Sequence, residues 1–93
     1  MESIKLHQLI ARGQVQQVGY RAYAKQRADI YHLEGKVKNL EDGTVEIFVK
    51  DSVYLKDFIH DLERYPDKSK LTTIENKGLV DFKLGYSGFL IDR

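Results

Sequence analysis

Residues 13–21 read GQVQQVGYR, a polar stretch with a glycine at its start and another near its end. Before it, the apolar residues of 4–12 fall on both parities, which predicts a strand that is buried on both faces. After it, apolar residues recur at helical spacing and predict a helix over residues 20–32. The stretch is therefore expected to be a loop that leaves a strand and opens a helix.

Two further extended segments are predicted at residues 33–40 and 43–50. The Asp-Gly pair between them is the strongest hairpin signal in the chain. A second helix follows, with Asp51 or Ser52 as its N-cap and with apolar residues spaced i, i+3, i+4 and i+7 from Leu55 onward.

Residues 71–77 and 79–91 are predicted as two more extended runs. The element order is then β-α-β-β-α-β with a short extra strand. Two helices must cover one face of the sheet, so we expect an α+β fold, a ferredoxin-like α/β sandwich with a four- to five-stranded, mainly antiparallel sheet. A chain of 93 residues suits one core, and we expect a single domain over residues 1–93.

Composition argues against several classes of function. The absence of cysteine removes thiol nucleophiles, thiolate metal sites and disulfides. A net charge of +1 disfavours a dedicated nucleic-acid binder, and no apolar run reaches the ~18 residues of a membrane span. We therefore expect a cytoplasmic protein with neither nucleic acid nor membrane as a partner.

The loop at residues 13–21 has the features of an anion site. Free backbone N–H groups and the positive end of the helix dipole meet where a helix begins. Arg21, in the first turn, is electrostatically unfavourable there unless a ligand supplies negative charge. The alternative interpretation is a solvated surface arginine, and spacing alone leaves both interpretations open. Residues 1–38 carry seven Lys and Arg against three Asp and Glu, which suits a small anion.

A second segment, residues 35–45, reads GKVKNLEDGTV and runs into the predicted hairpin. The ordinary role of Asn39 at such a place is to satisfy backbone groups of the turn. If the side chain faces inward, its amide can instead hold a water molecule, because it donates and accepts hydrogen bonds and carries no charge. The residues alone do not decide between these two roles.

Taken together, the two segments resemble the signatures of the acylphosphatase family. The first signature runs GxVQGVxFR, or the same with Tyr in place of Phe. The second has glycine, an aromatic residue, a small apolar residue, a basic residue and Asn, followed by xxxGxV. The matching residues are Gly13, Val15, Gln16, Val18, Tyr20 and Arg21 in the first, and Gly35, Val37, Lys38, Asn39, Gly43 and Val45 in the second.

This resemblance implies a monomeric enzyme that hydrolyses the carboxyl–phosphate bond of small acyl phosphates to a carboxylate and inorganic phosphate, with no metal or organic cofactor. It implies that Arg21 binds the phosphate together with loop amides, and that Asn39 orients the attacking water. Such a site works by positioning and charge stabilisation. The implied phosphate-binding residues are Val15, Gln16, Gln17, Val18, Gly19, Tyr20 and Arg21.

This chain departs from the family pattern at Gln17 and Asp51, where the family usually has glycine, and at Lys36, where it has an aromatic residue. A left-handed conformation at a non-glycine residue costs ~1–2 kcal/mol. The alternative function is therefore a catalytically weak anion-binding or regulatory module. A nucleic-acid-binding domain is a third hypothesis, which the charge disfavours. The three histidines lack metal-ligand spacing, and each is expected to be an ordinary polar or half-buried residue.

Overall fold

The computed structural model describes residues 3–16, 19–66, 71–83 and 85–92. The elements in chain order are β1 (Ile4–Arg12), α1 (Tyr20–Ile30), β2 (Gly35–Asn39), β3 (Val45–Lys50), α2 (Leu55–Glu63), β4 (Thr73–Phe82) and β5 (Phe89–Asp92). The predicted β-α-β-β-α-β order with a short extra strand is confirmed. Among the described residues, no helix is long and apolar enough to cross a membrane.

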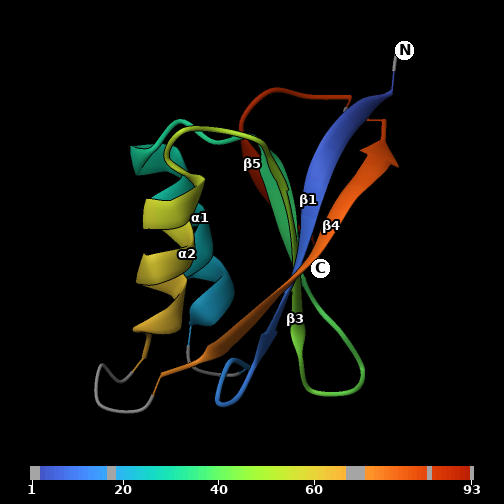
Figure 1. The fold of residues 1–93 in the computed structure, drawn as a ribbon. Helices are drawn as coiled ribbons and strands as arrows, with labels where there is room; N and C mark the ends of the chain where they lie inside the picture. Colours follow the sequence, from blue (N-terminus) through green and yellow to red (C-terminus); the bar gives the residue numbers. More distant parts are fainter. Residues whose placement is uncertain (1–2, 17–18, 67–70, 84, 93) are drawn as a thin grey trace.

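The strands form one mixed sheet in the order β4-β1-β3-β2-β5. Strand β2 pairs in parallel with β5, and every other neighbouring pair is antiparallel. Because β3 lies between β1 and β2, the β1-α1-β2 unit is split by a strand, as a ferredoxin-like fold requires. Figure 1 shows α1 and α2 together on one side of this sheet. The predicted α/β sandwich is confirmed.

The core lies between the sheet and the two helices. Strand β3 alternates as its sequence predicts, with Val45, Ile47 and Val49 fully buried on the helix side. Strand β1 is buried on both faces, because Leu9 pairs with Ile47 in the core and Leu6 is fully buried on the opposite parity. The helices contribute the buried residues Tyr20, Ala24, Ala28, Phe58 and Leu62.

The C-terminal third differs from the prediction. The runs at 71–77 and 79–91 were expected to be separate strands, but β4 passes continuously from Thr73 to Phe82, and β5 begins only at Phe89. The reason is topological: β4 pairs with β1 at one edge of the sheet, whereas β5 pairs with β2 at the other edge. The chain must leave the sheet between the two strands, which no local pattern reveals.

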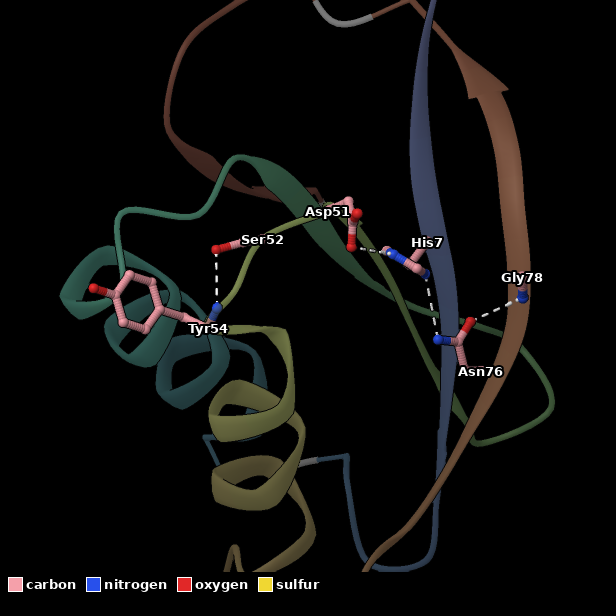
Figure 2. Close-up of polar contacts among 6 residues, drawn as sticks. All are labelled: His7, Asp51, Ser52, Tyr54, Asn76 and Gly78. Carbon is pink, nitrogen blue, oxygen red and sulfur yellow. Dashed lines mark hydrogen bonds and ion pairs between the residues drawn. The ribbon is translucent and has the colours of Figure 1, made fainter.

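Helix ends also differ in detail. Helix α1 stops at Ile30 rather than at residue 32, because His32 takes a positive φ of 56° and turns the chain. The N-cap position of α2 is Tyr54, without a side-chain cap, so the predicted N-cap at Asp51 or Ser52 is wrong. The Ser52 hydroxyl does accept the N–H of Tyr54 at 3.1 Å, but just before the helix begins (Figure 2).

Candidate active site

A cavity of about 280 Å³ opens where α1 begins. It collects residues from the loop after β1, from the first turn of α1, and from the ends of β2 and β5, two strands that are neighbours in the sheet. The lining residues are Val15, Gly19, Tyr20, Arg21, Ala22, Asn39 and Ile91. The fold thus brings the two sequence motifs to one place.

The start of α1 is fixed by Gly19 and Tyr20. Gly19 occupies the N-cap position with a φ of 76°, a left-handed conformation that glycine adopts without steric cost. The Tyr20 ring is buried, and its hydroxyl donates to the backbone oxygen of Leu62 at 3.0 Å. Burial raises the pKa of the Tyr20 phenol, so the group stays a protonated donor. This hydrogen bond therefore anchors the N-terminus of α1 to the last turn of α2.

Arg21 is half-buried in the first turn of α1, which contains no acidic residue. Its Nη1 donates a long hydrogen bond of 3.4 Å to the backbone oxygen of Asp92. One turn later, Lys25 donates to the backbone oxygen of Phe89 at 2.9 Å and also pairs with Asp29. The two cations hold β5 against α1. A guanidinium beside unopposed first-turn N–H groups makes this end of the cavity electropositive.

Asn39 ends β2 on the same side of the sheet as the buried Val37, so it faces α1. Its Oδ1 is buried and, within the described part of the chain, has no hydrogen-bond partner. The turn after β2 is satisfied by other groups: Asp42 accepts the N–H and the hydroxyl of Thr44 at 3.0 and 2.6 Å. These bonds hold the pKa of the Asp42 carboxyl below its usual value. The Asn39 oxygen is left for the cavity.

The predicted phosphate-binding residues are only partly brought together. Val15, Gly19, Tyr20 and Arg21 line the cavity, whereas Gln17 and Val18 lie outside the described residues. The Gln16 side chain is directed elsewhere and does not line the cavity. Its Nε2 donates to the backbone oxygens of Leu40 at 2.8 Å and Thr44 at 2.9 Å. This bridge between the loop and the hairpin turn was not foreseen from the sequence.

A family model described as Acylphosphatase matches residues 7–89. The chain belongs to the acylphosphatase family. It is 34% identical over 94 residues to the acylphosphatase of Pseudomonas paraeruginosa, with the whole of both chains covered. It is 33% identical over 87 residues to that of Bacillus licheniformis, with 86% of this chain and 97% of the relative covered.

The fold comparison agrees with the sequence comparison. The crystal structure of acylphosphatase from Bacillus subtilis matches with a TM-score of 0.76 at 28% identity, covering 97% of this chain and 100% of that one. The family, the ferredoxin-like fold and the class of enzyme expected from the two motifs are thereby confirmed.

Sequence reasoning missed two lining residues of this acylphosphatase-family site, Ala22 and Ile91. Ala22 follows the first motif directly and carries no distinctive chemistry. Ile91 reaches the cavity only because β5 pairs with β2. Ile91 lies two residues after Phe89, and this spacing is the sequence signal that places both side chains on the same face of a strand.

Lys36, which replaces the aromatic residue usual in the acylphosphatase family, lies on the sheet face opposite the buried Val37. Its Nζ lies 5.8 and 5.2 Å from the ring centroids of Phe48 and Phe82, and it pairs with the Asp92 carboxylate at 3.3 Å. The cation therefore packs on the aromatic pair of the open face. This departure from the family pattern is accommodated away from the cavity.

His7 lies between Asp51 and Asn76, as Figure 2 shows. Its Nε2 is 2.9 Å from the Asp51 Oδ1, and its Nδ1 is 3.3 Å from the Asn76 Nδ2. The Ser52 hydroxyl in Figure 2 accepts the N–H of Tyr54 at 3.1 Å and is not drawn in contact with His7. The contacts tie the end of β3 to β1 and β4. No group of three potential metal ligands occurs in residues 3–16, 19–66, 71–83 and 85–92.

Proposed function

We propose that this acylphosphatase-family enzyme hydrolyses the carboxyl–phosphate bond of small acyl phosphates through Arg21, the loop amides and Asn39. The observation that carries the proposal is that the Arg21 guanidinium, the first turn of α1 and the Asn39 amide line one cavity. Relatives named acylphosphatase over the full length of the chain support the substrate class. The products are a carboxylate and inorganic phosphate.

The phosphate group binds at the N-terminus of α1. The N–H groups of the first helical turn have no partner within the helix, and they converge on an anion placed there. Arg21 comes from the same turn, and a guanidinium can hold two phosphate oxygens at once. The backbone amides from Gln16 to Tyr20 complete the cradle in this proposal, whereas the Val15 N–H already donates to the backbone oxygen of Gly13 at 3.0 Å. Charge that develops on the phosphoryl oxygens is then stabilised by groups that are already in position.

Asn39 holds the attacking water. Its buried Oδ1 is an acceptor without a partner among the described residues, so a water that donates to it gains a fixed orientation. The water oxygen attacks phosphorus in line with the leaving carboxylate oxygen. An amide cannot act as a base, and we assign the water proton to a phosphate oxygen of the substrate. A carboxylate is a stable leaving group, so the reaction does not require a strong general acid.

We also propose that the enzyme is a monomer that uses only small-molecule partners and acts in the cytoplasm. Sedimentation at working concentration tests the monomer directly. Guanidinium and N–H groups supply the positive charge that the mechanism needs, so the proposal includes no metal or organic cofactor.

The deciding experiment is turnover of benzoyl phosphate by the purified protein, with inorganic phosphate as an inhibitor. We expect hydrolysis well above the uncatalysed rate and competitive inhibition by phosphate. Phosphate binding without any acceleration of hydrolysis would instead establish the alternative, a catalytically weak anion-binding or regulatory module.

A further inference from the structure

A second hollow adjoins the phosphate cavity on the flank of α1. It measures about 550 Å³ and is lined by Gly19, Ala22, Tyr23, Gln26 and Tyr65. Gly19 and Ala22 line both hollows, so the two meet at the first turn of the helix. None of the described residues that line this second hollow carries a charge.

Two tyrosines form a rigid wall in this hollow. The rings of Tyr23 and Tyr65 are stacked, with centroids 4.1 Å apart and planes 12° from parallel. The Tyr23 hydroxyl donates to the backbone oxygen of Asp61 at 3.3 Å, and the backbone oxygen of Tyr65 accepts the Thr72 hydroxyl at 2.7 Å. The Tyr65 hydroxyl lies over Gly19, 3.4 Å from where a β-carbon on that residue would stand. The wall is thus fixed beside the phosphate cradle.

The chemistry of the substrate requires such a neighbouring space. An acyl phosphate held by its phosphate in the Arg21 cavity must direct its acyl group out of that cavity. In-line attack places the leaving carboxylate opposite the water, and Asn39, which holds the water, belongs to β2. The second hollow contains α1 residues and Tyr65 but no described residue of β2 or β5. It is the adjoining space away from the strand that carries Asn39.

We infer that this hollow is the acyl-group subsite, and that the Tyr23–Tyr65 wall selects acyl phosphates whose acyl group is flat and uncharged. This inference rests on the proposed function and deepens it. Aromatic rings favour offset or edge contacts with another ring, and the described lining residues offer no charge to compensate a desolvated carboxylate on the acyl group. Aromatic acyl phosphates are then better substrates than their intrinsic reactivity alone explains.

The test compares kcat/KM for benzoyl phosphate and acetyl phosphate in the full chain and in Tyr65→Leu. We expect the benzoyl-to-acetyl ratio to fall by about three- to ten-fold, the range of one aromatic contact, mainly through a higher KM for benzoyl phosphate. Tyr65→Phe keeps the ring and should keep the ratio. Tyr23→Leu should lower the ratio in the same way, which preserves the test if Tyr65→Leu does not fold.

Tyr54→Leu is the matched control. Tyr54 also stacks on a tyrosine, Tyr31, with ring centroids 5.9 Å apart, but this pair lies at the opposite end of the two helices. The benzoyl-to-acetyl ratio of Tyr54→Leu should therefore match that of the unmodified chain. An unchanged ratio in both Tyr65→Leu and Tyr23→Leu overturns the subsite. The subsite is also overturned if the inhibition constant of inorganic phosphate rises as much as the KM for benzoyl phosphate. Phosphate has no acyl group, so a change in an acyl-group subsite should not weaken its binding. If the unmodified chain hydrolyses neither substrate, the proposed function itself fails, and the subsite with it.

Discussion

The Nε2 atom of Gln16 donates a hydrogen bond to the backbone oxygen of Leu40 at 2.8 Å, and Leu40 directly follows Asn39 in the chain. The same nitrogen reaches the backbone oxygen of Thr44 at 2.9 Å, where the N–H of Leu40 also donates. One side chain thereby ties the loop of the phosphate cradle to the turn that follows the water-holding residue. The two motifs of the family meet through this contact as well as through the cavity.

Removal of this bridge should impair turnover. In Gln16→Met the side chain keeps its length but cannot donate, so the two partly buried carbonyls lose one hydrogen bond each and keep only a backbone N–H donor, at a cost of about 0.5–1.5 kcal/mol in the free energy of unfolding. We expect kcat to fall by about ten-fold, because Asn39 is no longer held in register with the cradle. Gln8→Met is the matched control, since the Gln8 side chain bonds to Glu46 across the strands and does not line the cavity. Equal kcat values in the two variants would contradict the coupling.

Arg21→Gln should abolish recognition of phosphate. Glutamine can still donate one hydrogen bond but carries no charge and cannot form the paired contact of a guanidinium. We expect competitive inhibition by inorganic phosphate to disappear and kcat/KM to fall by at least about a hundred-fold. Arg12→Gln removes an equivalent charge that pairs with Glu75 outside the cavity, and it should leave both quantities close to those of the unmodified chain. Phosphate inhibition that survives in Arg21→Gln would exclude the assigned role.

Asn39→Ala should separate binding from chemistry. With no amide to orient the water, kcat is expected to fall by about 10²-fold, the effect of removing one preorganised polar group, while phosphate inhibition is largely retained. Asn39→Asp places a negative charge beside the bound anion, so this variant should lose phosphate inhibition as well. Retention of full kcat in Asn39→Ala would show that the water is held by another group.

These residues also show what the sequence reveals and what it does not. The loop with Arg21 and the strand end with Asn39 could be predicted because each motif is local: glycines, a helix start and a hairpin turn lie within a few residues of one another. Ile91, Tyr65 and the side-chain role of Gln16 could not, because each depends on a partner far away in the chain. The break between β4 and β5 escaped for the same reason, since pairing at opposite edges of the sheet decides it.

Gly35 in the second motif has a steric explanation. A β-carbon at this position would overlap the backbone oxygen of Phe48 and stand 2.8 Å from its carbonyl carbon, because β2 and β3 approach closely there. Gly35→Ala should therefore push the two strands apart. Gly78→Ala is the control, since Gly78 also has a positive φ, of 101°, but open space around it. We expect Gly35→Ala to lose roughly 1–3 kcal/mol more in urea unfolding than Gly78→Ala. Equal losses in the free energy of unfolding would mean that the positive φ, and not the close approach to Phe48, sets the cost at Gly35.

Tyr20 should make the fold sensitive to alkaline pH. Desolvation by burial raises the pKa of its phenol above the value of about 10 found in an unfolded chain. The fold thus favours the neutral phenol, and this contribution to stability is fully present below pH ~10 and is lost as pH rises toward the raised pKa.

Urea unfolding at about pH 8 and about pH 11 measures this loss, because only the higher pH lies above the phenol pKa of the unfolded chain. Tyr20→Phe lacks the hydrogen bond to Leu62, so it should be less stable at the lower pH by about 0.5–1.5 kcal/mol. Its free energy of unfolding should then fall less than that of the unmodified chain between the two pH values. A parallel fall in the free energy of unfolding of both proteins would show that other groups set the alkaline limit. Tyr20 would then anchor α1 through its hydrogen bond without contributing to the pH dependence.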